Sequence, residues 1–328
     1  MNLRVRPWIE YFVMREQFAD FFPTQAVHSY AAFAGASGDC IKAEPRTRVV
    51  MLARSRPTAA TEKPEHFIFK EYYYRLLPRL RTWLRHSKAE HEFRSLLQVA
   101  SQGIEAAEPV ACGIRRTLFG YVRSCFIITR YVENSYTLAQ RFEAADNLGM
   151  TQTELNWFVC SELGQIFRTL HRRKFFLFTA KPRNILLARI AGTPEIFVID
   201  LPYALRITKQ PLARWAQARD LAAFLSNFEP VSSVGHRADF YNAYLPDPLG
   251  ASRDDLERRM EGAIRRRRNQ TPISSLLHSF RTASKKWRRP RESRRQVCAP
   301  VANHFTLCLN CRMSLSSAIL TRRLLYSI

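Results

Sequence analysis

Four polar residues stand where apolar runs begin or end, and together they suit chemistry on phosphate groups. Lys70 lies in a strand-like run, and Glu92 follows it in a segment with helical spacing. Asn184 precedes one short apolar run and Asp200 ends the next. Phosphoryl transfer needs a cation on the α and β phosphates, an acid that fixes this cation, and oxygen ligands for Mg²⁺. The four residues could supply these groups in that order.

Each residue taken alone also has a structural explanation. A lysine at the end of an apolar strand is commonly an edge or snorkelling residue. Asp200 and Asn184 could be turn residues, and Glu90 offers a second acid, although it lies off the helical face of Glu92. The order of the four groups along the chain, rather than any one of them, favours a functional site.

The elements that must position these residues form a β-rich part followed by a helical part. The first part has an antiparallel set of four or five strands with one inserted helix, which Ser87 begins and Gly103 ends. Thr151 and Glu154 form a capping box at the start of a later helix. The predicted strands cover residues 49–52, 66–72, 109–114, 118–131, 184–187 and 196–200, and the predicted helices cover 7–21, 87–102, 151–171 and 212–228.

The composition is that of a globular chain with a sizeable core. The 328 residues are 46% hydrophobic. They contain no run of about 18 uncharged apolar residues, which is the length that a helix needs to span a bilayer. Charged residues near the start leave no apolar core for a signal peptide, so a cytoplasmic protein is expected. Seven scattered cysteines disfavour a disulfide framework. Cys308 and Cys311, with Cys298 and His304 nearby, are weak evidence for zinc.

The net charge of +23 is unevenly distributed. Residues 261–328 contain 15 Lys and Arg and two Glu, and we expect residues 265–296 to be a solvated or disordered basic segment. Such a tail predicts anionic partners, which are lipid headgroups, phosphorylated glycolipid or nucleic acid. Residues 307–328 could add a short amphipathic contact with a membrane. A sequence-specific nucleic-acid protein has little support beyond charge, because no helix-turn-helix or RNP motif is visible.

Five strings occur in an order and spacing that match a known family: Ser87–Leu97, Leu170–His171, Lys181–Leu187, Phe197–Leu201 and Ala218–Ala222. Through them, residues 42–250 resemble the lipopolysaccharide core kinases of the Kdo and WaaP type. The resemblance implies an α+β, protein-kinase-like fold of two lobes: a small antiparallel β lobe with one helix and a mainly helical lobe. It also implies that ATP and Mg²⁺ are used to phosphorylate a sugar hydroxyl of the lipopolysaccharide inner core.

The same resemblance implies a role for each matching residue. Lys70 would bind phosphates and Glu92 would pair with it, while Asn184 and Asp200 would hold the metal. Lys181 would neutralise charge on the γ-phosphate, and Asp220 would brace the catalytic loop. The hinge beside adenine would be Tyr131, Val132 and Glu133. The implied domains are an extension over 1–41, lobes over 42–133 and 134–260, and the basic tail over 261–328.

Two departures from the family pattern leave two hypotheses open. Thr179 occupies the position of the usual catalytic Asp, five residues before Asn184, and cannot act as a base near pH 7. No glycine lies between Gly38 and Gly103, where a phosphate-covering loop should fall, and Arg46 or Arg48 could contact phosphate there instead. The protein is therefore either a phosphotransferase with an impaired loop or a pseudokinase that binds nucleotide or glycolipid.

The expected partners follow from the acceptor and the charge. Only about 20 residues separate Asp200 from Asp220, which is too short for a regulated activation segment and favours a glycolipid over a protein acceptor. We expect lipopolysaccharide core or another phosphorylated glycolipid as acceptor and an anionic membrane surface as partner of the tail. We therefore expect a peripheral location on the inner face of the cytoplasmic membrane. We expect no specific nucleic acid as a partner.

Overall fold

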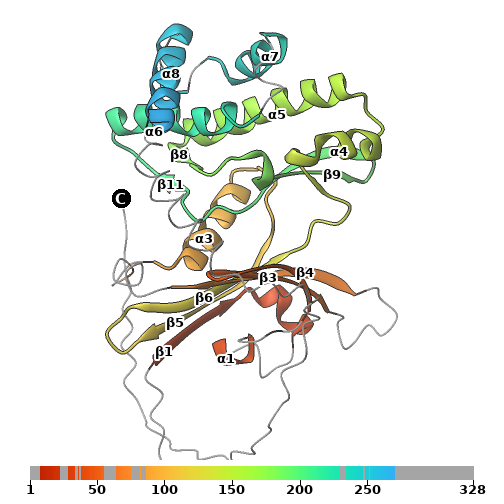
Figure 1. Cartoon of the computed structure of the whole chain (residues 1–328), viewed down its shortest axis with the longest axis vertical. Helices are drawn as coiled ribbons and strands as arrows, with labels where there is room; N and C mark the ends of the chain where they lie inside the picture. The colour runs from red at the N-terminus through yellow and green to blue at the C-terminus, as the bar shows by residue number, and fades with distance from the viewer. Residues whose placement is uncertain are drawn as a thin grey trace, which may run out of the picture. The chain divides into compact units, whose positions relative to one another are not determined.

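The contacts in the computed structural model divide the chain into two units, residues 1–272 and residues 273–328. Within the chain, the structure describes residues 8–22, 29–33, 36, 38–54, 64–74, 82, 86–228, 234–246, 248–250 and 252–269. These residues form a mixed arrangement of helices and antiparallel sheet (Figure 1). No described helix is both long and apolar enough to cross a membrane.

The first part of the chain builds a six-stranded sheet in which every neighbouring pair is antiparallel. The strand order is β1-β5-β6-β4-β3-β2, so the first two strands in sequence occupy opposite edges. The strands are β1 (Trp8–Met14), β2 (Asp39–Glu44), β3 (Thr47–Arg54), β4 (Glu65–Tyr73), β5 (Pro109–Thr117) and β6 (Val122–Arg130).

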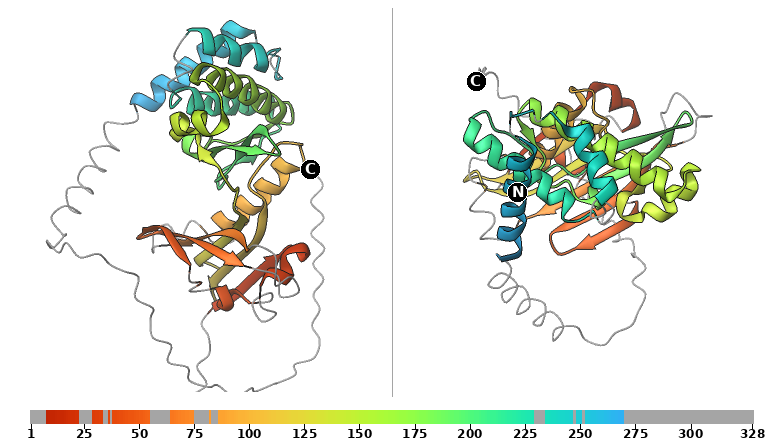
Figure 2. Two further views of the ribbon diagram at one scale, coloured as in Figure 1. Left: turned by 90° about the vertical axis from the view of Figure 1, so that its right-hand side faces the viewer. Right: turned by 90° about the horizontal axis from the view of Figure 1, so that it is seen from above.

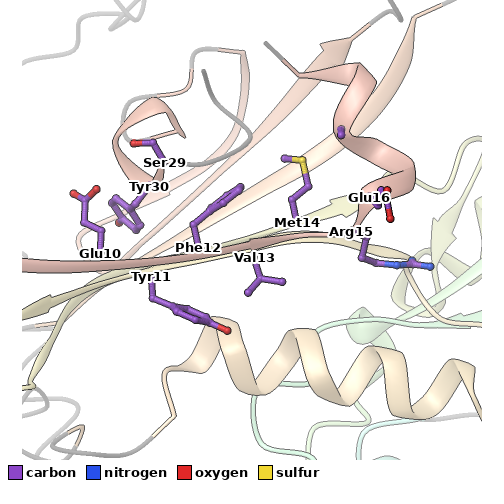
Figure 3. A pocket seen from close by; sticks show the side chains of 10 residues that line it. Glu10, Tyr11, Phe12, Val13, Met14, Arg15, Glu16, Ser29 and Tyr30 are labelled. Atoms are coloured by element: carbon purple, nitrogen blue, oxygen red, sulfur yellow. The ribbon is translucent and has the colours of Figure 1, made fainter. Parts of the chain in front are cut away.

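Each face of this sheet has its own cover. Helix α3 (Lys88–Ala100) lies on one face and buries Phe93, Leu96 and Val99. An aromatic cluster covers the other face, where helix α1 (Tyr30–Phe33) and the 3-10 helix η1 (Glu16–Phe21) contribute rings. The alternation is visible along β1 in Figure 3: Tyr11 and Val13 point to one side and Phe12 and Met14 to the other. Side chains on one face of a strand recur with period two, so this strand serves both cores.

The later part of the chain is mainly helical (Figure 2). Helix α5 packs against α7, and α6 packs against α8. Their buried aromatic rings, including Phe167, Phe224 and Phe240, contact one another at centroid distances between 5.6 and 6.1 Å. The helices are α4 (Arg141–Leu148), α5 (Gln152–Arg172), α6 (Gln210–Leu225), α7 (Val234–Tyr244) and α8 (Arg253–Asn269). The short 3-10 helices are η2 (Leu138–Gln140) and η3 (Pro182–Asn184).

Five short strands accompany these helices. β9 (Ile185–Ile190) pairs with β10 (Thr193–Val198) and with β7 (Tyr136–Thr137), and β11 (Leu205–Arg206) pairs with β8 (Phe175–Phe176). The β9–β10 hairpin brings Asn184, the residue before β9, close to Ile199 and Asp200, the two residues after β10. One local hairpin thus places Asn184 near Asp200.

Most predicted elements are confirmed within a few residues. Ser87 accepts a hydrogen bond from the Glu90 amide at 3.1 Å at the start of α3, and the Thr151–Glu154 capping box begins α5. The helix predicted over 7–21 is wrong, because residues 8–14 form β1 and only 16–21 turn helically. The expected four or five strands are six, since β1 and β2 add to both edges.

The basic tail begins inside a helix. α8 continues to Asn269, so residues 265–269 are helical and not part of a disordered segment. The rest of residues 270–328, with Cys298, His304, Cys308 and Cys311, lies outside the described residues. Of the four cysteines that the structure describes, Cys112, Cys125 and Cys160 are buried thiols and Cys40 is exposed. A buried free cysteine packs as a small hydrophobic side chain, and these three do so.

Candidate active site

Lys70 and Glu92 meet between strand β4 and helix α3. The Lys70 ammonium lies 3.3 Å from Glu92 Oε1, and their side chains are 17% and 4% exposed. Glu90, the second acid considered from the sequence, instead contacts His86 at 2.8 Å and Arg94 at 2.7 Å. The two acids are two positions apart on a helix and therefore face different directions. Glu92 is the one that the fold turns toward the sheet.

Asp200 reaches the same ammonium from the other side. Its Oδ1 contacts Lys70 Nζ directly, and its side chain is 35% exposed. Asp200 follows β10 with a φ of +58°, in the left-handed region that few non-glycine residues adopt. The Ile199 amide donates to the Asn184 carbonyl at 3.0 Å, which holds the end of β10 beside the start of β9. Lys70 is thus enclosed by two carboxylates from distant segments.

Tyr72 is a site residue that the sequence analysis missed. Its hydroxyl donates to Glu92 Oε2 at 2.7 Å, and its ring lies 5.2 Å from Lys70 Nζ. Lys70 and Tyr72 are two residues apart on one strand and so share a face. That spacing was the available signal. The hydroxyl fixes the carboxylate that in turn fixes the lysine.

The electrostatics of the group keep Lys70 charged. Burial by itself lowers the pKa of the Lys70 ammonium, but Glu92 and Asp200 outweigh burial and raise this pKa above its usual value. Burial raises the pKa of the Glu92 carboxyl, while Lys70 opposes the rise and Asp200 adds to it. Burial and the neighbouring Glu92 also raise the pKa of Tyr72, so its hydroxyl remains a donor.

A buried aspartate holds the loop between β8 and η3. Asp220, from α6, is fully buried and accepts from the Leu177 amide at 2.6 Å and the Phe178 amide at 2.8 Å. Phe178 has a φ of +56°, a conformation that costs about 1–3 kcal/mol for a non-glycine residue. The two charge-assisted hydrogen bonds offset that strain. The expectation that Asp220 braces this loop is confirmed.

His171 belongs to the same buried support and not to the reacting centre. Its Nε2 lies 3.3 Å from Asp220 Oδ2, and its Nδ1 lies 2.9 Å from the Tyr244 hydroxyl. Gln217 donates to the same hydroxyl at 2.6 Å. The ring is fully buried at the end of α5. His171 therefore acts as a structural residue that supports Asp220.

Thr179 and Asn184 are linked within the loop. The Thr179 hydroxyl donates toward the carbonyls of Asp200, at 3.0 Å, and Leu177, at 3.2 Å. Asn184 Nδ2 donates to the Thr179 carbonyl at 2.8 Å, so its amide oxygen is the group left for a ligand. Lys181 lies between them at the start of η3. The loop therefore brings Thr179 to the Asp200 carbonyl and Asn184 to the Ile199 amide, with Lys181 between them in the chain.

Asn184 and Asp200 fit a magnesium ion. Both offer oxygen donors, which Mg²⁺ prefers, and Mg²⁺ sites commonly use only one or two protein ligands together with substrate phosphates. Among the described residues there is no cluster of three or more His, Cys, Asp or Glu that could hold a metal on its own. A shared site completed by phosphate oxygens is the arrangement that this donor set supports.

The predicted hinge residues lie in a separate cavity. Tyr131, Val132 and Glu133 line a cavity of about 560 Å³ together with His66, Arg130 and the end of α3. The Tyr131 amide donates to the His66 carbonyl at 2.9 Å, and Glu133 lies 3.6 Å from His66 Nδ1. The described lining does not contain Lys70, Glu92, Asn184 or Asp200. This cavity therefore does not connect the predicted hinge with the four residues that are predicted to bind phosphates and metal.

Arg48 does not take the place of a phosphate-covering loop. It donates to the Ala36 carbonyl at 3.0 Å, lies 3.7 Å from Glu71 and stacks over Phe69 at 5.6 Å. Phe69 and Glu71 alternate with Lys70 along β4, so Arg48 lies on the opposite face of the sheet. Arg46 forms the β2–β3 turn, where its carbonyl accepts from the Tyr73 amide.

A second cavity follows strand β1 at the sheet edge. It has a volume of about 610 Å³ and is lined by Glu10–Glu16, Ala19, Ser29 and Tyr30 (Figure 3). None of the predicted site residues belongs to this described lining.

Comparisons with known proteins give a family from a family model and a shared fold from a solved structure. A family model described as the lipopolysaccharide kinase (Kdo/WaaP) family matches residues 43–244. Among solved structures, the chain is similar to one described as WaaP in complex with acyl carrier protein. That match has a TM-score of 0.55 and 16% identity, and covers 78% of this chain and 98% of the other. No curated protein matches the sequence.

Proposed function

The chain belongs to the lipopolysaccharide kinase (Kdo/WaaP) family, and we propose that it transfers the γ-phosphoryl group of ATP to a sugar hydroxyl of the lipopolysaccharide inner core. The observation that supports this proposal most directly is the enclosure of Lys70 between Glu92 and Asp200, with Asn184 beside Asp200. The proposal includes a protein-kinase-like arrangement of two lobes, over residues 42–133 and 134–260.

Each residue then has a stated task. Lys70, held by Glu92 and Tyr72, binds the α and β phosphates, and Asn184 and Asp200 hold Mg²⁺. The bound ion would neutralise the charge that develops on the transferred phosphoryl group. Lys181 approaches the γ-phosphate from the loop, and Tyr131–Glu133 take the hinge role beside adenine. Asp220 sets the loop that presents these groups.

The acceptor is proposed to be a glycolipid. Beyond Asp200 the chain folds back at once: Leu205 pairs with Phe176, and the Ile207 amide donates to the Lys174 carbonyl at 2.9 Å. No long activation segment fits into this connection. Control by phosphorylation of such a segment, which protein kinases use, is therefore not expected here.

The catalytic loop points to slow transfer. The Thr179 hydroxyl donates to two carbonyls, and a neutral hydroxyl cannot act as a general base near neutral pH. A general base contributes about 10²- to 10⁴-fold to rate, so its loss leaves positioning and electrostatic stabilisation. A pseudokinase that binds nucleotide or glycolipid without transfer is the second candidate, and Thr179 is the observation that favours it.

Binding and transfer experiments separate these candidates. We expect Mg²⁺-dependent stabilisation by ATP in a thermal-shift assay, and its loss in Lys70→Met. Lys42→Met is the matched control, because Lys42 is an exposed lysine paired with Glu44 on β2. Absence of ATP binding by the unaltered protein would contradict the kinase and the nucleotide-binding form of the pseudokinase, and would leave only a glycolipid-binding pseudokinase. Equal binding by Lys70→Met would contradict the site assignment.

Transfer of radiolabelled phosphate from ATP to purified core glycolipid is the second measurement. Thr179→Asp supplies the missing base and should raise the transfer rate, while Thr179→Asn, of similar size, should not. ATP binding without transfer in the unaltered protein and in both variants would favour the pseudokinase. The proposed location, peripheral on the inner face of the cytoplasmic membrane, brings the enzyme to this acceptor.

A further inference from the structure

Large apolar side chains are exposed along the segment that follows Asp200. Tyr203 is 53% exposed, Leu205 48%, Leu212 53% and Trp215 45%. These four lie within residues 203–215: Tyr203 is in a turn, Leu205 is on β11, and Leu212 and Trp215 are on the first turns of α6. Exposed apolar side chains gathered in one segment mark an interaction surface more often than scattered ones do.

The charges in this segment all have one sign. Residues 201–219 contain Arg206, Lys209, Arg214 and Arg219 and no acidic residue. Arg206, Lys209 and Arg219 are exposed. The Arg219 guanidinium lies 5.2 Å from the Trp215 ring and 6.0 Å from the Phe178 ring. We define the docking face as Tyr203, Leu205, Leu212 and Trp215 together with Arg206, Lys209 and Arg219.

The docking face adjoins the candidate active site at two points. Phe178, next to Thr179 in the loop, has its ring 6.4 Å from that of Trp215. Lys88 Nζ lies 5.5 Å from the Tyr203 ring and 5.6 Å from the Tyr72 ring, and Tyr72 holds Glu92. The face is also rigid, because α6 buries Ala213, Ala216 and Asp220 on its inner side. A ligand on this face would therefore lie beside the reacting groups.

We propose that the docking face binds the surface of an anionic lipid bilayer. Aromatic and aliphatic side chains flanked by Arg and Lys suit the boundary between headgroups and acyl chains, where apolar burial and attraction to anionic lipids act together. The absence of acidic residues removes the repulsion that such a surface would otherwise meet. A lipid-anchored acceptor, as in the proposed function, would then reach Asp200 without leaving the bilayer. The binding itself does not depend on that function.

Vesicle co-sedimentation of the full chain tests the affinity. We expect binding to vesicles of phosphatidylcholine with phosphatidylglycerol in raised salt, where attraction of the basic tail is screened. The double variant Leu212→Ser with Trp215→Ser should bind about tenfold more weakly, since it removes two exposed apolar groups. Trp157→Ser is the matched control, because Trp157 is 56% exposed on α5, away from this segment.

Quenching by brominated lipid tests the location. Trp215→Phe keeps the apolar area but removes the fluorophore, so the lipid-dependent quenching should fall, whereas Trp157→Phe should leave it unchanged. Unaltered binding by the double variant, or quenching that Trp215→Phe does not reduce, would overturn the proposal. Binding of an acidic protein in place of vesicles through Leu212 and Trp215 would overturn it as well. Circular dichroism and the melting temperature confirm that each variant is folded, and ATP binding reports separately on the proposed function.

Discussion

At the scale of single residues, the site depends on three contacts that join four side chains. Tyr72 donates to Glu92, Glu92 pairs with Lys70, and Lys70 contacts Asp200. A buried ion pair stabilises a protein only when its remaining hydrogen-bonding capacity is also satisfied. Tyr72 satisfies that condition for Glu92. We therefore assign Tyr72 a positioning role, one step removed from the phosphates.

The hydroxyl of Tyr72 can be removed without changing the packing. Tyr72→Phe should lower the free energy of unfolding by about 1.5–3 kcal/mol, the usual contribution of a hydrogen bond to a charged group. It should also weaken ATP binding several-fold. Tyr74→Phe should leave ATP binding unchanged, because the Tyr74 hydroxyl, two residues further along the chain, accepts from the Lys88 amide. Denaturant titration and thermal shift measure the two effects. Unchanged ATP affinity in Tyr72→Phe would remove Tyr72 from the site.

The raised pKa of Glu92 predicts an acid limit for nucleotide binding. Because burial raises this pKa, the carboxylate gains its proton at a higher pH than an exposed glutamate, whose pKa is about 4.3. Protonation removes the partner of Lys70, so ATP affinity should fall as the pH drops through the raised pKa. Glu92→Gln should bind ATP weakly with a flattened acid limb. If the ATP affinity of Glu92→Gln falls just as steeply at acid pH, the group that titrates is not Glu92.

At the scale of elements, α6 acts as the support of the loop. Asp220 has both carboxylate oxygens occupied by successive backbone amides, and His171 closes the group from α5. The left-handed backbone at Phe178 persists only because these bonds determine it. The loop geometry therefore depends on a helix that contributes nothing to the phosphate site itself.

Asp220→Asn tests this support. The amide nitrogen of Asn would face a backbone N–H, and a buried donor would remain unsatisfied. We expect a loss of about 3 kcal/mol in the free energy of unfolding, together with weaker transfer. Asp146→Asn, an exposed aspartate on α4, should change neither quantity. A stability loss in Asp220→Asn below that of an ordinary surface change would show that the loop holds its shape without Asp220.

The sequence predicts local elements better than distant pairings. The starts of α3 and α5 can be predicted because each capping residue and its partner are only three residues apart. These pairs are Ser87 with Glu90 and Thr151 with Glu154. Strand β1 is not, because its partner β5 lies about a hundred residues further on and Met14 pairs with Ala111. The same limit explains the site. Lys70, Glu92, Asn184 and Asp200 follow from spacing, whereas the contacts of Asp200 with Lys70 and of Tyr72 with Glu92 need the assembled fold.

At the scale of the whole molecule, the positive charge has two separable parts. Residues 273–328 carry eleven Lys and Arg and one Glu, outside the compact unit over residues 1–272. Their attraction to an anionic surface acts over a Debye length of about 10 Å at 0.1 M salt and weakens as salt rises. The docking face adds apolar contact, which salt does not screen. Salt dependence should therefore distinguish the tail from the docking face.

A chain that ends at Pro272 should lose most of the salt-dependent part of vesicle binding and retain the salt-resistant part. Each Lys or Arg near an anionic surface contributes about 1 kcal/mol, so the loss at low salt should be large. The melting temperature and ATP affinity should not change, since Lys70, Asn184 and Asp200 all lie within the compact unit. Adding Leu212→Ser and Trp215→Ser to the shortened chain should then remove the remaining binding. If shortening instead lowers ATP affinity, residues 273–328 take part in nucleotide binding, and the division of the charge into two independent parts is wrong.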